Sequence, residues 1–206
     1  MARERATALL IDFDGVLRRW DPTVAARVER AYGLSDGVLG EIAMSWDVLQ
    51  PVLVGKVSHA EWMSSVADAL TPSVGDAGRA RAAVAEWQRY RGEVDPEVLA
   101  FVREVRAAGV PVGLGTNATD QLDADLAALG LTDDFDVVVN SSVIGVHKPA
   151  KEYFQAACEA LATPPARVLF VDDEPRAVAG ARVAGLSAHR WGGPADLRYL
   201  RAALAY

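Results

Sequence analysis

The chain has 206 residues, of which 51 % are hydrophobic and 24 % charged, as in an ordinary soluble globular protein. Its formal net charge of −7 argues against broad binding to nucleic acid or to an anionic membrane surface. The single cysteine excludes an internal disulfide framework, and no apolar stretch resembles a signal peptide or a membrane span. We therefore expect a cytoplasmic protein, a monomer or a homodimer, without nucleic-acid or membrane partners.

Taken in chain order, the sequence opens with an apolar run and then changes character. The run TALLI at 7–11 predicts a buried strand. The interval 16–93 has no convincing buried strand, reads as four helices and holds four of the five tryptophans. We expect a helical module there, inserted directly after the first strand.

Beyond this interval, strands and helices alternate. Apolar runs predict strands at 110–115, 135–140 and 167–171, with a weaker one at 186–191. Helical patterns lie before and between them, at 95–109, 119–130, 150–162 and 174–185. Such alternation predicts an α/β fold, a Rossmann-like parallel sheet with helices on both faces. The core would comprise residues 1–15 and 94–206, and the helical module residues 16–93.

Polar residues follow each strong predicted strand. In chain order they are Asp12 and Asp14, then Thr116 and Asn117, then Lys148, then Asp172 and Asp173. Ligands of open α/β sheets bind outside the carboxyl ends of the strands, so these side chains should gather on one rim. Carboxylates without a Cys or His cluster suit Mg²⁺, which with the lysine would offset their repulsion of a phosphate. The rim therefore predicts a site for Mg²⁺ and a small phosphate ester.

Four motifs in this order resemble those of the haloacid dehalogenase (HAD) superfamily. LLIDFDGVL resembles the first, an apolar strand followed by Asp-x-Asp-Gly, and GLGTNAT resembles the second. VHKPAKEYF resembles the third, and VLFVDDEPRAVAGARVAG the fourth, an acidic pair between a strand and a small-residue helix. The four motifs span residues 8–185. The resemblance implies that the module at 16–93 is a helical cap, which closes over the site and selects substrates.

The resemblance also implies roles for the carboxylates. Asp12 would be the nucleophile that forms an aspartyl-phosphate. Asp14 would be the general acid/base, which protonates the leaving alcohol and then activates water. Magnesium would be held by the Asp12 carboxylate, the Asp14 backbone carbonyl, and Asp172 and Asp173 directly or through water. Of that last pair we favour Asp173 as the direct ligand.

For the phosphoryl group, the resemblance implies binding by Thr116 with Asn117, and pairing with Lys148. The chain departs from the family pattern at Arg176, near a place where Asn is frequent. We expect contacts behind the metal site to differ for that reason.

Three residues just after the first motif are candidates for substrate contacts. Arg18, Arg19 and Trp20 stand where the leading edge of a cap would hang over the site. The alternative reading, solvated arginines and a packing tryptophan, stays open.

Together these features predict a Mg²⁺-dependent phosphomonoester hydrolase that acts on a small phosphorylated metabolite. Asp14 favours this chemistry, because family members that cleave carbon–halogen bonds usually lack an acid at that position. A sugar phosphomutase would use the same residues and is the main alternative. A non-catalytic phosphoaspartate switch is another, against which the long helical insert argues.

Overall fold

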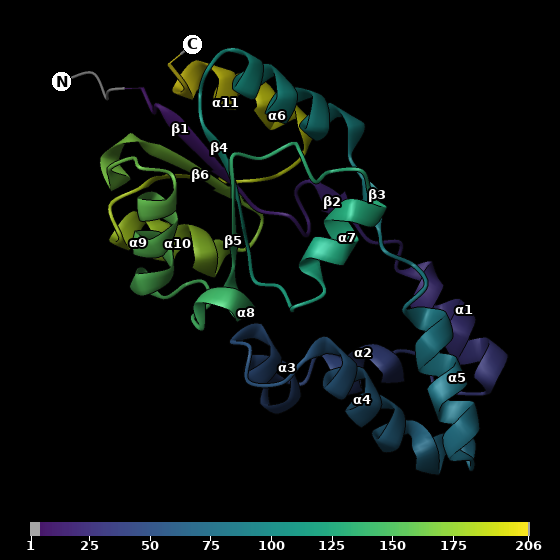
Figure 1. Cartoon of the computed structure of the whole chain (residues 1–206). Coiled ribbons are helices and arrows are strands. Elements are labelled where there is room, and N and C mark those ends of the chain that lie inside the picture. Colours follow the sequence, from purple (N-terminus) through teal and green to yellow (C-terminus); the bar gives the residue numbers. More distant parts are fainter. Residues whose placement is uncertain (1–4, 206) are drawn as a thin grey trace.

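The computed structural model describes residues 5–205. Its centre is a parallel sheet of five strands in the order β5-β4-β1-β6-β7 (Figure 1). The strands are β1 (Ala8–Ile11), β4 (Val112–Thr116), β5 (Val137–Asn140), β6 (Val168–Asp172) and β7 (Ser187–Arg190). Each overlaps a predicted apolar run, including the weak one, so the predicted α/β class with a parallel sheet is confirmed.

Helices cover both faces of this sheet. They are α6 (Pro96–Ala107), α7 (Leu122–Ala128), α8 (Ser141–Ile144), α9 (Lys151–Ala160), α10 (Pro175–Val183) and α11 (Leu197–Ala203). In Figure 1, α6 and α11 lie on one side of the sheet, and α9 and α10 lie on the other. No helix within residues 5–205 has both the length and the apolar character needed to cross a membrane.

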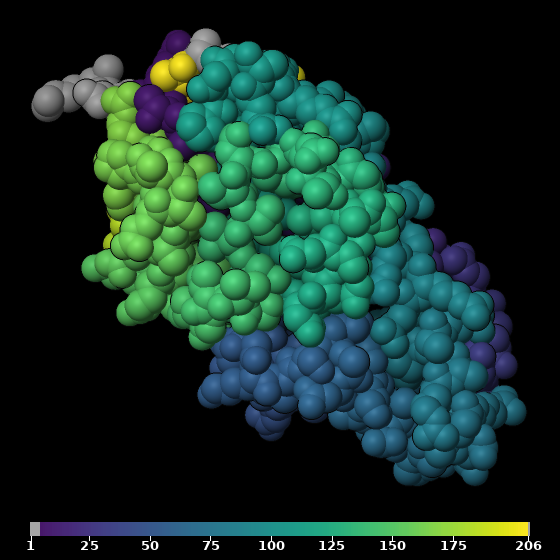
Figure 2. Space-filling model, in the orientation of Figure 1, coloured from purple at the N-terminus to yellow at the C-terminus, as the bar shows by residue number. Residues whose placement is uncertain are grey.

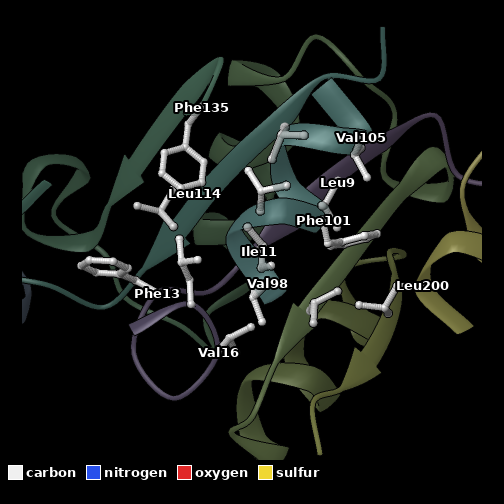
Figure 3. Packing of buried hydrophobic residues seen from close by; sticks show 14 of the residues in the cluster. Leu9, Ile11, Phe13, Val16, Val98, Phe101, Val105, Leu114, Phe135 and Leu200 are labelled. Carbon is white, nitrogen blue, oxygen red and sulfur yellow. The ribbon is translucent and has the colours of Figure 1, made fainter. Parts of the chain in front are cut away.

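Alternation along β1 explains how one strand serves two cores. Leu9 and Ile11 join an apolar cluster on one face of the sheet, and Ala8 and Leu10 join a second cluster on the other face. Figure 3 shows the first cluster, where Leu9 and Ile11 lie close to Phe101 of α6. Because both faces are covered, the strand is apolar throughout until Asp12.

Residues 23–87 form a helical module between β2 and β3. Its helices are α1 (Thr23–Tyr32), α2 (Val38–Ala43), α3 (Trp46–Leu53), α4 (His59–Val74) and α5 (Ala77–Trp87), and they pack around an apolar core of their own. The sequence predicts four helices here, and that number is wrong. The second predicted helix splits at Ser45, which is extended and whose carbonyl accepts hydrogen bonds from the backbone N–H groups of Val48 and Leu49. A new helix therefore begins at Trp46.

A short antiparallel ribbon joins the helical module to the sheet layer. Its strands are β2 (Arg18–Arg19) and β3 (Glu93–Val94), so the outgoing and returning connections pair with each other. The ribbon is too short to produce a readable alternation of apolar and polar residues. The sequence did not predict it for that reason.

The helical module rests against the loops at the carboxyl ends of the strands. A Cβ on Gly55 would lie 2.2 Å from the carbonyl oxygen of Ser142 in α8. The backbone N–H of His59 donates to the Asp120 carboxylate at 2.7 Å. In the space-filling view, the blue surface of the module meets the green surface of the sheet layer (Figure 2). The module thus lies over the rim where the predicted site residues gather.

Candidate active site

The carboxyl ends of β1, β4 and β6 border a cavity of about 460 Å³. Six of the predicted site residues line it: Asp12, Asp14, Thr116, Asn117, Lys148 and Asp172. They come from four separate chain segments and meet because parallel strands place their carboxyl ends on one edge. The structure thus brings together groups that are far apart in the sequence.

Lys148 lies between two carboxylates in this cavity. Its ammonium donates to Oδ1 of Asp12 at 2.7 Å and to Oδ2 of Asp172 at 2.6 Å. A third hydrogen bond runs to the carbonyl oxygen of Gly115 at 3.0 Å. An ammonium has three N–H donors, so all of them are used. Lys148 therefore neutralises and positions the carboxylates around it.

Two buried carboxylates share this one ammonium, which leaves an excess of negative charge. Burial raises the pKa of Asp12 to about 7; Lys148 opposes this effect and Asp172 adds to it. Burial alone would lower the pKa of Lys148, but Asp12 and Asp172 outweigh it and hold that pKa above its usual value. Lys148 therefore stays charged, and the excess negative charge favours binding of a further cation beside Asp12.

A third carboxylate completes a cluster suited to a metal. Oxygens of Asp12, Asp172 and Asp173 lie within 4.8 Å of one another. Asp172 is buried and also accepts the Glu174 backbone N–H at 2.8 Å, whereas Asp173 is exposed. Gly15 permits this approach, because at φ 82° a Cβ there would lie 2.3 Å from Oδ2 of Asp173. Hard oxygen donors with excess negative charge fit Mg²⁺.

The second predicted motif supports the lysine as well as lining the cavity. Thr116 is the buried last residue of β4. The side-chain amide of Asn117 accepts the Lys148 backbone N–H at 2.8 Å and donates to the Lys148 carbonyl at 3.1 Å. Asn117 thus fixes the loop from which Lys148 projects. Sequence reasoning did not identify this positioning contact.

Asp14 is held differently from Asp12. Its carboxylate accepts two hydrogen bonds from Arg18 and one from Trp20, whose Nε1 lies 2.6 Å from Oδ1. The Asp14 side chain is 38 % exposed, whereas that of Arg18 is only 5 % exposed. A further Arg18 nitrogen donates to Asp125 of α7 at 2.8 Å. Asp14 is therefore fixed by a residue of the connecting ribbon.

The three candidates for substrate contacts lie outside the cavity wall. Arg18 is buried and directed at Asp14, so it is not free to contact a substrate in this arrangement. Arg19 is exposed, with Nε 3.5 Å from Oδ2 of Asp95. Trp20 packs edge-on against Tyr90 with a centroid distance of 5.8 Å. Arg18 and Trp20 thus both hold the Asp14 carboxylate, and neither lines the cavity.

Six further residues line the cavity: Trp46, His147, Pro149, Glu174, Arg176 and Ala177. Trp46 comes from the helical module, is 57 % exposed, and packs edge-on against His147 at 5.4 Å between centroids. Nothing in the local sequence distinguishes it from the other tryptophans of the insert. Arg176 lies on the cavity wall, rather than behind the acidic cluster where sequence reasoning put its effect.

Fold and site together define a hydrolase of the haloacid dehalogenase type. Residues 6–185 match the sequence profile of the haloacid dehalogenase-like hydrolases, and the chain belongs to that family. Phosphatase MT3486 of Mycobacterium tuberculosis (strain CDC 1551 / Oshkosh) is 32 % identical over 192 residues, covering 89 % of this chain and 86 % of the relative. The chain is thus an enzyme of this hydrolase family, with relatives that are named as phosphatases.

Solved structures of the family share the fold. A HAD-family enzyme of Bacteroides thetaiotaomicron, in complex with magnesium and inorganic phosphate, aligns with a TM-score of 0.68 at 19 % identity, covering 90 % of this chain and 93 % of that one. The L-2-haloacid dehalogenase of Xanthobacter autotrophicus aligns with a TM-score of 0.64 at 26 % identity, covering 96 % and 87 %. The fold alone therefore does not choose between the two chemistries.

Proposed function

We propose that this chain hydrolyses a small phosphomonoester, with Mg²⁺, by phosphoryl transfer to Asp12. One observation carries the proposal: Lys148 joins Asp12 to Asp172 at the edge of an open cavity, with Asp173 beside them. This arrangement offers an oriented carboxylate nucleophile and a charge balance that favours a bound cation. A phosphoryl group needs positioning and charge neutralisation more than covalent assistance.

The reaction has two balanced steps. In the first, an Asp12 oxygen forms a bond to phosphorus while the bond to the leaving oxygen breaks, and Asp14 gives that oxygen its proton. In the second, Asp14 takes a proton from water, the water oxygen bonds to phosphorus, and the Asp12–phosphorus bond breaks. Phosphate is released and both carboxylates regain their starting states.

Magnesium would be held by Asp12, Asp172 and Asp173, together with the backbone carbonyl of Asp14. Of the neighbours Asp172 and Asp173, we favour Asp173 as the residue that contacts the metal directly. Asp172 already bonds Lys148 and the Glu174 N–H, whereas Asp173 faces solvent. When bound, the ion supplies positive charge that stabilises the transferring phosphoryl group. The Bacteroides thetaiotaomicron enzyme that shares this fold was solved with magnesium and inorganic phosphate, which supports a role for the metal.

The helical module would act as the cap of the site, with 16–93 as cap and the rest as core. Its α3 places Trp46 on the cavity wall, and its Gly55 packs against α8. A cap in this place limits the substrate to a small metabolite and excludes water during the first step.

The presence of Asp14 separates this proposal from dehalogenation. A departing alkoxide needs a proton, whereas halide leaves as a stable anion, so an acid beside the nucleophile serves ester cleavage. Named phosphatases among the relatives support the same choice. The phosphomutase and the phosphoaspartate switch share the first step with this hydrolysis and differ from it in the fate of the phosphoryl group.

The test is phosphate release from an aryl phosphate, with and without Mg²⁺. We expect turnover that requires the metal, that disappears in Asp12→Asn and that persists in Asp68→Asn, an exposed control on α4. Turnover retained in Asp12→Asn would contradict the mechanism. Isomerisation of a sugar phosphate without net release would replace it with the mutase, and a long-lived phosphoprotein would replace it with the switch. Halide release from 2-chloropropionate alone would replace it with dehalogenation.

A further inference from the structure

We propose that Arg176 binds a second anionic group on the leaving portion of the substrate. The preferred substrates would then be small phosphomonoesters that also carry a carboxylate or another phosphate. This inference rests on the proposed function, because it concerns the same cavity, but it names a substrate class that the reaction itself does not require.

The first support is the location of Arg176. It lies in the first turn of α10 and lines the same cavity as Asp12 and Lys148. Its side chain is exposed, and within residues 5–205 its guanidinium has neither an ion-pair nor a hydrogen-bond partner. Arg176 therefore borders the cavity, and its guanidinium donors are available to a ligand.

The second support is that Arg176 does not stabilise its own helix. A cation near a helix N-terminus is unfavourable, because the unpaired N–H groups there already carry partial positive charge. The helix is capped instead by Glu174, whose Oε1 accepts the Arg176 backbone N–H at 3.1 Å. An arginine at this position is thus better explained by a ligand than by the helix.

The third support is the charge balance of the cavity. Lys148, the other Lys or Arg side chain on the wall, already has all three donors bonded to protein acceptors. Arg18 is bonded to Asp14 and Asp125 outside the wall. A leaving group with its own negative charge would meet several carboxylates here. Arg176 is the cation on the wall that remains to offset that repulsion, and its planar fork suits carboxylate and phosphate alike.

The cavity also limits the size of the ligand. A volume of 460 Å³ lies within the range of about 300–1,000 Å³ that is typical of small-molecule sites. The edge-to-face pair of Trp46 and His147 forms another part of the wall. The leaving group would lie between this aromatic pair and Arg176.

The experiment compares esters that differ in the second anion alone. One arm sets 3-phosphoglycerate against glycerol 3-phosphate, which share a carbon skeleton, and a second arm sets glucose 1,6-bisphosphate against glucose 6-phosphate. We expect kcat/KM to favour the additional anion about tenfold, as a hydrogen bond to a charged group would give. The pair of esters with the larger ratio of kcat/KM shows whether Arg176 prefers a carboxylate or a phosphate.

Arg176→Gln should reduce that ratio to near one by lowering kcat/KM for the anionic member alone. Arg182→Gln is the matched control, because Arg182 is exposed near the other end of α10 and donates to the carbonyl of Ala188. Thermal melting should show Arg176→Gln to be no less stable than the parent, since it removes a cation from the helix N-terminus.

Binding separates the two proposals. Calorimetric titration of Asp12→Asn with the same ester pairs needs no turnover and should show the same preference. Equal affinity for both members, or a ratio unchanged by Arg176→Gln, would overturn this inference while aryl phosphate hydrolysis still supported the proposed function. Absence of all phosphatase activity would overturn the proposed function, and this inference with it.

Discussion

The guanidinium of Arg18 holds both carboxylate oxygens of Asp14, with Nε 2.7 Å from Oδ1 and Nη2 2.9 Å from Oδ2. The guanidinium lies over the rings of Phe13 and Trp20, at 4.1 Å and 4.5 Å from their centroids. Because Arg18 belongs to the ribbon that leads into the helical module, the proposed acid/base is tied to the connection between this module and the sheet.

The first prediction concerns this pair. In Arg18→Lys, a single ammonium replaces the two-pronged contact, so Asp14 loses its fixed orientation. We expect kcat to fall about tenfold or more while KM changes less than about threefold, since the loss affects proton transfer and not binding. Steady-state kinetics with a phosphomonoester measures both constants.

A double variant distinguishes positioning from general damage. If Arg18 acts through Asp14, then Arg18→Lys should lower kcat little further once Asp14→Asn is present. Arg103→Lys is the control, because Arg103 makes the same two-pronged contact with Asp134, and neither residue lines the cavity. Additive losses in the double variant would show that Arg18 does not act through Asp14.

The second prediction concerns the lysine. Lys148→Met leaves Asp12 and Asp172 buried without their shared counter-ion, so the free energy of unfolding should fall by about 3 kcal/mol. Chemical denaturation without metal measures this loss. The double variant Lys148→Met/Asp172→Asn should recover part of the stability and none of the activity. An unchanged free energy of unfolding in Lys148→Met would contradict the charge balance described for the site.

The third prediction links magnesium to pH. The pKa of Asp12 is raised by burial to about 7 in the folded chain, so protonation there stabilises the fold fully below its unfolded value, near 3.8. That stability is lost as the pH rises through about 7. Mg²⁺ binds the ionised carboxylates, so the metal should raise the melting temperature more at about pH 8 than at about pH 5.

Removal of the metal provides the control for this linkage. Chelation at about pH 8 should abolish phosphate release and return the melting temperature to that of the metal-free protein. In Asp12→Asn, the rise in melting temperature caused by Mg²⁺ should depend less on pH, because one titrating ligand is gone. A magnesium effect of equal size at both pH values would argue against these carboxylates as the binding site.

The fourth prediction concerns the acid stability of the sheet. Burial opposes ionisation of Asp136, but the Val112 N–H and the Arg106 guanidinium outweigh it and hold the pKa of Asp136 below its usual value. Its contribution to stability is therefore present above about pH 4 and is lost as the pH falls through the lowered value. Asp136→Asn should lower the free energy of unfolding by less than about 1 kcal/mol at neutral pH, because the ion pair of Asp136 with Arg106 is partly exposed.

Denaturation curves over a pH series test this sign. The difference in the free energy of unfolding between Asp136→Asn and the parent should shrink below about pH 4. Asp68→Asn should match the parent at every pH. A difference that grows in acid would mean that the carboxylate is not held in its ionised form.

Most of the fold could be predicted because buried parallel strands appear as apolar runs. The polar residues that end those runs could then be placed on one rim by the topology alone. The break at Ser45 could not be predicted, because apolar residues continue through both helices that it separates. The ribbon at Arg18–Arg19 is shorter than any periodic pattern.

The contacts of individual site residues were harder to predict than their location. The pattern RRW does not reveal that Arg18 turns inward to Asp14 while Arg19 turns outward, because that choice depends on the ribbon and on α7. The place of Trp46 on the cavity wall depends on how the helical module packs on the core, and that of Arg176 depends on how α10 packs beside β6. Such tertiary placement leaves no trace in local sequence.

The most direct measurement of the proposed phosphoryl transfer is the mass of the peptide that carries Asp12, isolated from a reaction quenched in acid during turnover. We expect this peptide to gain one phosphoryl group, located on Asp12. The gain should be absent in Asp12→Asn, which should also release no phosphate. Phosphate release with an unmodified Asp12, or a phosphoryl group on another residue, would contradict transfer to Asp12.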